Sequence, residues 1–265
     1  MVYRSHCLTK WLLKHGHIVT FLYFLASTNI SYSQEVPSFF SLSFVTGYGG
    51  YAMPDLKRIN TTVSQSLPFK AADVNSFDPG LYFSISVNYQ KDLLYVSLGY
   101  QNYTTGSRIG LKDYSGIYTF DQIVGGHLAF FQPGIIFGNK SLSAMPSLPM
   151  GLMISTLRLD ENLKVGEFER QDELKMTAKS LVFVPSLNVN ISVLPFLGLT
   201  CAAGWMIDNG GKFHIKKHKE ASLNIGGQVK SGWQGLRLSF GITLKIAHKN
   251  TTVKEFRQSD YFDVY

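Results

Sequence analysis

The sequence predicts an all-β fold, an antiparallel transmembrane β-barrel of about eight to ten strands, with ten slightly favoured and a short helix in the first long loop. Three observations predict it. Apolar and polar residues alternate over runs of about ten positions, and short and long connections follow one another along the chain. In addition, no segment after residue 33 has the ~18 uninterrupted apolar residues of a spanning helix.

Alternation is clearest in residues 81–90, 94–101, 181–193 and 236–247, where every second residue is apolar and those between are mostly small or polar. Because a strand sends successive side chains to opposite faces, the pattern indicates strands with one apolar and one polar face. Several runs reach the ~9–11 residues that a tilted strand needs to cross a bilayer. The predicted strands are Phe39–Tyr48, Leu81–Gln90, Leu94–Gln101, Ile123–Phe137, Leu142–Thr156, Leu181–Val193, Phe196–Ile207, Ser222–Lys230 and Leu236–Ala247.

These nine segments are an odd number, whereas a bacterial barrel with both ends on one side of the membrane has an even number of strands. Residues 253–265 would supply a tenth strand, and their last residue, Tyr265, is similar to the terminal aromatic residue of many outer-membrane barrels. Acidic and basic residues weaken this assignment, so eight strands are an alternative.

A soluble β-sandwich or lipocalin-like barrel would show the same alternation with the two faces exchanged, its apolar face inward and its polar face in water. The polar faces here are rich in Ser, Gly, Asn and Thr and poor in charge. A soluble surface usually has about 25–35% charged residues. The composition therefore favours the membrane barrel.

The connections give independent support, because barrels of the outer membrane alternate short periplasmic turns with long outer loops. The short connections are Lys91-Asp92, Gly138-Asn139-Lys140, Leu194-Pro195 and Ser231–Gly235. The long, polar connections are Gly49–Gly80, Thr104–Gln122, Arg158–Lys175 and Asp208–Lys219.

Residues 1–33 resemble a cleaved signal peptide, since Arg4, Lys10 and Lys14 precede the apolar stretch 18–27. The barrel domain would then be residues 34–265. Residues 1–33 contain no acidic residue, so removing these three basic residues lowers the formal charge from +7 to +4. A charge this small gives no support for a nucleic-acid partner.

Three segments near the first two long connections resemble one family. They are Tyr48–Lys57, which leads into a predicted helix at residues 53–67, Phe77–Pro79, and Thr104–Arg108 followed by Lys112–Gly116. Together they are similar to an uncharacterised family of outer-membrane β-barrel proteins of Bacteroidota-type bacteria. The resemblance implies the fold and a location in the bacterial outer membrane, and it supplies no catalytic residue. The helix would lie at the surface or plug the lumen.

The second long connection gathers hydroxyl groups and charges that could bind a sugar or phosphate through charge-assisted hydrogen bonds. An ordinary polar loop, whose glycines meet turn geometry, is the alternative. The predicted ligand contacts are Thr105, Ser107, Arg108, Lys112, Asp113 and Tyr114.

Other chemistry has weaker support. His127 could serve a serine nucleophile in a lipid hydrolase, but a lone histidine there favours an interfacial side chain. His214 and His218 are surrounded by lysines that would repel a cation, so no metal site and no cofactor are predicted. Arg158, Lys230, Arg237 and Lys245 lie near predicted strand ends, which favours interfacial positions over a basic lumen.

The sequence thus leaves three hypotheses for function. The first is a structural or ligand- or partner-binding barrel that acts through its surface loops. The second is a narrow transporter or pore for small or hydrophobic solutes, and the third is an outer-membrane lipid hydrolase. The first, non-enzymatic hypothesis is preferred, with outer-membrane lipid, lipopolysaccharide, the barrel-assembly machinery and an envelope protein as expected partners.

Overall fold

A computed structural model describes residues 38–69, 71–114, 116–139, 141–215, 218–222 and 227–246. The predicted signal segment, residues 1–33, and the predicted tenth strand, residues 253–265, lie outside the described residues. Among the described residues, no helix has the length and apolar character needed to cross a bilayer.

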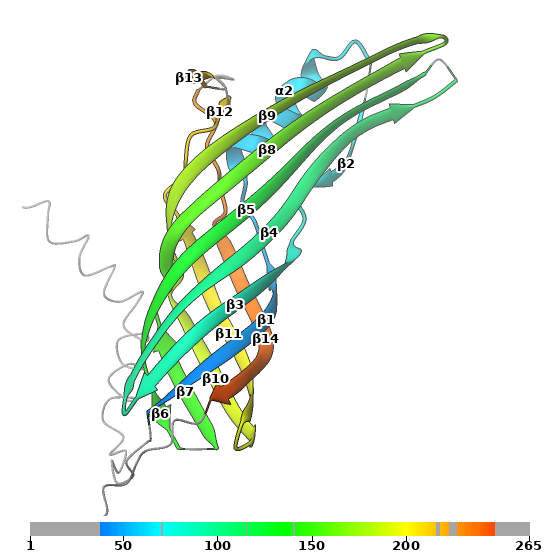
Figure 1. Ribbon diagram of the computed structural model, residues 1–265. Coiled ribbons are helices and arrows are strands. Elements are labelled where there is room, and N and C mark those ends of the chain that lie inside the picture. The colour runs from blue at the N-terminus through cyan, green and yellow to red at the C-terminus, as the bar shows by residue number, and fades with distance from the viewer. Residues whose placement is uncertain are drawn as a thin grey trace, which may run out of the picture. The chain divides into compact units, whose positions relative to one another are not determined.

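Antiparallel pairing closes eight strands into one ring (Figure 1). Each strand pairs with the next, and β14 pairs with β1 over Phe40–Gly49 to complete the ring. A closed ring removes the unpaired edges that an open sheet would present. The ring strands, in order, are β1 (Phe39–Gly49), β3 (Gly80–Lys91), β4 (Leu94–Lys112), β5 (Ile117–Ile135), β8 (Met150–Val165), β9 (Phe168–Phe183), β11 (Leu197–Asp208) and β14 (Gly235–Ile246).

Two ring positions are each built from two strands with a proline at the junction. β7 (Leu142–Ser147) leads into β8 past Pro149, and β9 leads into β10 (Ser186–Leu194) past Pro185. Proline has no N–H to donate to the ladder, so each junction interrupts the regular pairing. The ladder resumes on both sides, because β7 pairs with β10 and β8 pairs with β9.

The eight-stranded ring lies at the lower end of the predicted range, below the favoured ten. The predicted strand Ser222–Lys230 is not a ring strand. Within its described residues, Ser222 ends the short β13 (His218–Ser222), which pairs with β12 (His214–Ile215). Lys230 forms only an isolated bridge with Lys212. The two-residue β6 (Phe137–Gly138) follows β5 and pairs with β7.

The apolar face of the ring points outward and the polar face points inward. Buried polar side chains line the interior, among them Ser41, Ser43, Asn88, Gln132 and Asn188. The outward face exposes large apolar side chains, among them Phe40, Phe44, Leu81, Phe83, Val87, Leu238, Phe240 and Ile242. A soluble barrel would have the reverse arrangement, so the predicted transmembrane β-barrel is confirmed and the lipocalin-like alternative is wrong.

Two hairpins extend beyond the rest of the ring, where the sequence predicted long polar loops (Figure 1). β4 and β5 stay paired as far as Lys112 and Ile117, and β8 and β9 as far as Val165 and Phe168. The loop prediction for Thr104–Gln122 and Arg158–Lys175 is therefore wrong. The outer face of these hairpins is charged because it faces water, and that composition resembles a loop.

The inner face of the extended hairpins packs against α2 (Pro54–Ser66), and β2 (Ala72–Ser76) pairs with β4. Pro54 and Asp55 suit the first turn of a helix, where an N–H is not needed and a negative charge is favourable. Leu56 and Ile59 are buried, and Val63 packs against the same core. The predicted helix in the first long loop is confirmed.

The orientation of the faces predicts different costs for one added charge. Phe240→Arg places a guanidinium on the outer face, where we expect it to lower the free energy of unfolding by about 2–4 kcal/mol or more. The control is Ser84→Arg, on the inner face of the wall, for which we expect a smaller loss. Urea unfolding in lipid vesicles measures both values, and equal losses would contradict the orientation of the faces.

Candidate functional site

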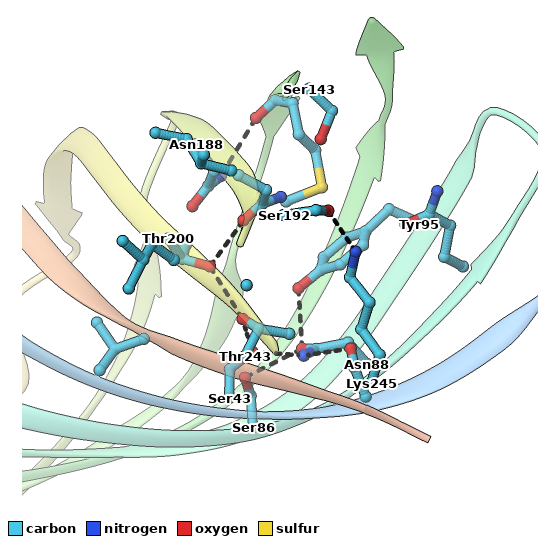
Figure 2. Close-up of a pocket in the computed structure, with 18 of the residues that line it drawn as sticks. Ser43, Ser86, Asn88, Tyr95, Ser143, Asn188, Ser192, Thr200, Thr243 and Lys245 are labelled. Atoms are coloured by element: carbon cyan, nitrogen blue, oxygen red, sulfur yellow. Dashed lines mark hydrogen bonds between the residues drawn. The ribbon is translucent and has the colours of Figure 1, made fainter. Parts of the chain in front are cut away.

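The interior of the barrel has an open part and a closed part. The open part is a cavity of about 680 Å³, here named the lumen cavity (Figure 2). It extends from the turn residues Asn139 and Pro195 to Tyr82, Gln101 and Phe130. On the side of the extended hairpins, a core of buried side chains fills the interior. The lumen cavity is thus a pocket closed at one end.

Trp233 lies at the centre of the closed part and is fully buried. Its indole N–H donates to Ser155 Oγ at 2.8 Å, and its ring lies 5.1 Å from Tyr51 and 5.6 Å from Tyr103 between centroids. Gly126 leaves room for this ring, since a Cβ there would lie 2.8 Å from Trp233 Cζ2. The indole therefore blocks the lumen as a packed side chain.

Two buried charged side chains hold the backbone of Trp233 from opposite sides. Arg237 Nη2 donates to the Trp233 carbonyl at 2.8 Å, and the Trp233 N–H donates to Asp208 Oδ2 at 3.2 Å. Arg237 also lies over the rings of Tyr51 and Tyr103, 4.8 Å and 5.2 Å from their centroids. Buried charges are costly unless they are hydrogen-bonded, and here backbone groups bond both, although the Nε of Arg237 is buried without a described partner. We name this arrangement the Trp233 clamp.

Helix α2 is tied both to the Trp233 segment and to the extended hairpins. The Met53 N–H donates to the Gly232 carbonyl at 2.9 Å, and a Cβ on Gly232 would lie 2.8 Å from Pro54 Cδ. On the hairpin side, Asn60 Nδ2 donates to Ser107 Oγ at 3.0 Å and Asn60 Oδ1 accepts from Gln122. Since Asn60 is buried, these bonds fix the helix in one position.

The predicted ligand-contact residues are divided between two faces of the first hairpin. Thr105 and Ser107 are buried on its inner face, where Thr105 donates to the Asp78 carbonyl at 3.1 Å. Arg108 lies on the outer face and forms an ion pair with Asp121 at 2.6 Å. The other three contact residues, Lys112, Asp113 and Tyr114, are exposed near the hairpin tip. The structure does not gather the six side chains into one pocket, and ligand contact at this hairpin stays a prediction.

The outer face of the second hairpin carries a chain of ion pairs. Arg158 lies 2.7 Å from Asp160 and 2.9 Å from Glu173, and Lys175 lies 2.8 Å from Glu173. The Lys175 ammonium, with Arg158, holds the pKa of Glu173 below its ordinary value. Exposed pairs of this kind contribute little to stability, about 0–1 kcal/mol each. Together these side chains form an exposed surface that carries both positive and negative charges.

The inner face of the hairpins is buried, in contrast to their exposed and charged outer face. Burial, together with the nearby Glu161 carboxylate, raises the pKa of Tyr118 to about 12. The Tyr118 ring lies 5.5 Å from Phe69 between centroids. The phenol therefore stays neutral at physiological pH and packs as part of the core.

The candidate catalytic histidine lies on the outside of the barrel. His127 Nδ1 is hydrogen-bonded to the exposed Tyr100 hydroxyl and to the amide of the half-buried Asn102. No described serine or carboxylate is hydrogen-bonded to this ring. For the lysine-rich segment, the structure describes His214 in β12 and leaves the side chain of His218 undescribed.

Two basic residues expected at the membrane interface face the interior. Arg237 is buried in the Trp233 clamp, and Lys245 lines the lumen cavity. Their place on the polar face of the alternating segment 236–247 is the signal that could have identified them, since Ser239, Gly241 and Thr243 share that face.

No protein-family model matches this chain, and no curated protein matches it. Solved structures of outer-membrane β-barrels are similar to it. Neisserial surface protein A is 14% identical over 80% of this chain and 100% of that chain, with a TM-score of 0.34. Ail of Yersinia pestis is 8% identical over 80% and 100%, with a TM-score of 0.36, and OprG of Pseudomonas aeruginosa is 14% identical over 82% and 99%, also at 0.36. The fold assignment rests on the closed ring and its apolar outer face.

Truncation of the buried indole tests the closed part of the lumen. We expect Trp233→Ala to lower the free energy of unfolding by about 3–5 kcal/mol, because it leaves a cavity and an unpaired Ser155 hydroxyl. Trp205→Ala, at an exposed tryptophan on the outer wall, is the matched control and should cost less. Urea unfolding in vesicles gives both values, and a loss at Trp233 no larger than at Trp205 would contradict the packed closure.

Proposed function

We propose that the protein is a non-enzymatic binding barrel of the bacterial outer membrane, which presents its two extended hairpins to an envelope protein partner. The interaction would use the outer face of β4, β5, β8 and β9. The barrel itself would hold this surface above the lipid, and lipopolysaccharide would surround its base. No cofactor and no catalytic step belong to this proposal.

The ordered state of the hairpins is the observation that supports the proposal most. Backbone pairing continues almost to both tips, and the inner face is packed on α2 through Leu56, Ile59 and Asn60. A partner that binds such a surface meets side chains already in position, so little conformational entropy is lost on binding. The ion pairs of Arg158 and Glu173 offer charge complementarity of either sign.

The short and long connections support the sidedness of this proposal. Turns such as Lys91–Leu94 and Leu194–Leu197 lie at one end of the ring, and both extended hairpins lie at the other. Short turns are periplasmic and long connections extracellular in barrels of this class. The hairpins would accordingly extend outward from the cell.

The lumen cavity favours the transporter hypothesis as a second candidate, because a pocket of about 680 Å³ that is lined partly by polar side chains lies inside the barrel. The core around the Trp233 clamp opposes free passage, since its buried side chains fill the interior on the side of the extended hairpins. Eight strands also enclose an interior only wide enough to be filled by side chains or to hold one small ligand. Transport would require the clamp to open.

Site-specific photo-crosslinking in cells of the native organism tests the partner hypothesis. A photoreactive residue replaces Lys175 on the hairpin face, and the control replaces Lys91 in a turn at the opposite end. We expect one discrete envelope-protein adduct from the first position and none from the second. Charge reversal by Arg158→Glu should reduce the adduct yield several-fold. Equal adducts from both positions, or none from the hairpin, would refute the proposal.

Single-channel recording in planar bilayers separates the two candidates. We expect the wild-type barrel to show no steady conductance, because the Trp233 clamp closes the lumen. The matched variants are Trp233→Ala and Trp205→Ala, and only the first should show brief openings. Discrete conductance of the wild type would favour the transporter.

A further inference from the structure

The lumen cavity is lined by polar side chains and by apolar ones such as Phe39, Ile191 and Leu199. Its polar side chains are Ser, Thr, Asn, Gln and Tyr, and Lys245 is the only Lys, Arg, Asp or Glu among the described residues that line it. A volume of about 680 Å³ falls within the ~300–1,000 Å³ of ordinary small-molecule sites. The pocket therefore has the size and the donors and acceptors for a hydroxylated ligand.

Lys245 projects into the lumen cavity from β14 (Figure 2). Its ammonium donates one hydrogen bond to Ser192 Oγ and lies 5.6 Å from the centroid of the Phe39 ring. It forms no ion pair with any described carboxylate. An ammonium has three donors, so two remain for a ligand. A half-buried cation without a counter-ion attracts an anionic group.

The neutral part of the lining is held in position by its own hydrogen bonds. Asn88 Nδ2 donates to Ser43 Oγ at 2.8 Å, and Asn88 Oδ1 accepts from the Tyr95 hydroxyl at 2.8 Å. Ser43 in turn is bonded to Thr243 at 2.8 Å, which continues to Thr200 at 2.9 Å. Asn88 also donates to Ser41 and accepts from Ser86, so its amide is fully bonded and serves to fix the wall. Asn190 lines the same cavity, accepts from Thr200 and keeps its amide donors for a ligand hydroxyl.

The closed end makes this pocket suited to binding. The core around Trp233 and Tyr103 lies beyond it, whereas Asn139 and Pro195 mark the end with the short turns. A solute that enters from the turn end meets Lys245 and Ser192 early, and the Asn88 hydrogen bonds lie on the neighbouring wall.

We infer that the lumen cavity binds a small hydroxylated anion, a sugar acid or a sugar phosphate, with Lys245 at its anionic group and neutral side chains of the lining, such as Asn190 and Thr243, at its hydroxyls. This site is separate from the hairpin surface of the proposed function. It can exist whether or not that surface binds a partner.

Isothermal titration calorimetry on the refolded barrel in detergent micelles tests the inference. The probes are gluconate and glucose 6-phosphate, with glucose as the neutral analogue and inorganic phosphate as the anion without hydroxyls. We expect both hydroxylated anions to bind at least tenfold more tightly than either comparison probe. Comparing the affinities of gluconate and glucose 6-phosphate shows whether the site prefers a carboxylate or a phosphate.

Two variants and one control make the result specific. Lys245→Met should weaken the binding of both anions at least tenfold and leave the affinity for glucose unchanged. Lys179→Met, on the exposed wall, should leave the affinity for every probe unchanged. Ser84→Trp fills the pocket and should weaken every probe that binds. Heat-modifiable gel mobility confirms that each variant is folded.

Several outcomes would overturn the inference. Equal binding of glucose and the two anions, or unchanged anion affinity in Lys245→Met, would remove the role of the charge. Inorganic phosphate binding as tightly as glucose 6-phosphate would remove the role of the hydroxyl contacts. No heat from any probe at millimolar concentration, with the barrel folded, would remove the site.

Discussion

The closed part of the barrel depends on the backbone of one residue, Trp233. The Trp233 N–H is bound by Asp208 and its carbonyl by Arg237, so two charges that would be costly alone inside a barrel are each hydrogen-bonded to backbone. This arrangement fixes where the indole lies. The indole then fills the space beside Ser155 that Gly126 leaves open. The position of α2 follows, because Met53 is bonded to the residue before Trp233.

Along one wall of the barrel, β4 and β5 face lipid over one part of their length and water over the next. Near the turns, β4 and β5 expose Leu98 and Phe131 on the outside and keep Ser97 and Gln132 inside. Farther along, the inner face becomes apolar and the outer face becomes charged. Near the turns, the strands therefore face lipid outside and a polar interior inside. In the extended hairpins, the same strands face water outside and an apolar core inside.

Alternation alone was sufficient to predict β14, because residues 236–247 keep period two with little charge. The same period continues in β4 beyond Thr104, where Thr105, Ser107 and Ile109 are buried, but Arg108 and the glycines resemble a loop. The Trp233 clamp could not be predicted, since Arg237 and Asp208 bind backbone atoms and such partners leave no side-chain pattern. Lys245 was ambiguous because a lysine near a strand end fits an interface equally well.

The Trp233 clamp joins parts of the chain that are far apart in sequence and are therefore synthesised at different times. Gly50 and Tyr51 follow the first ring strand, whereas Trp233 precedes the last ring strand and Arg237 belongs to it. Both sets must be present before the Trp233 clamp can close the lumen. A chain that has not yet paired β14 with β1 would leave the indole and its apolar neighbours open to water. Closure of the lumen by the Trp233 clamp is thus a late event in folding and a marker of a completed barrel. A protease added during assembly would distinguish completed barrels from unfinished chains.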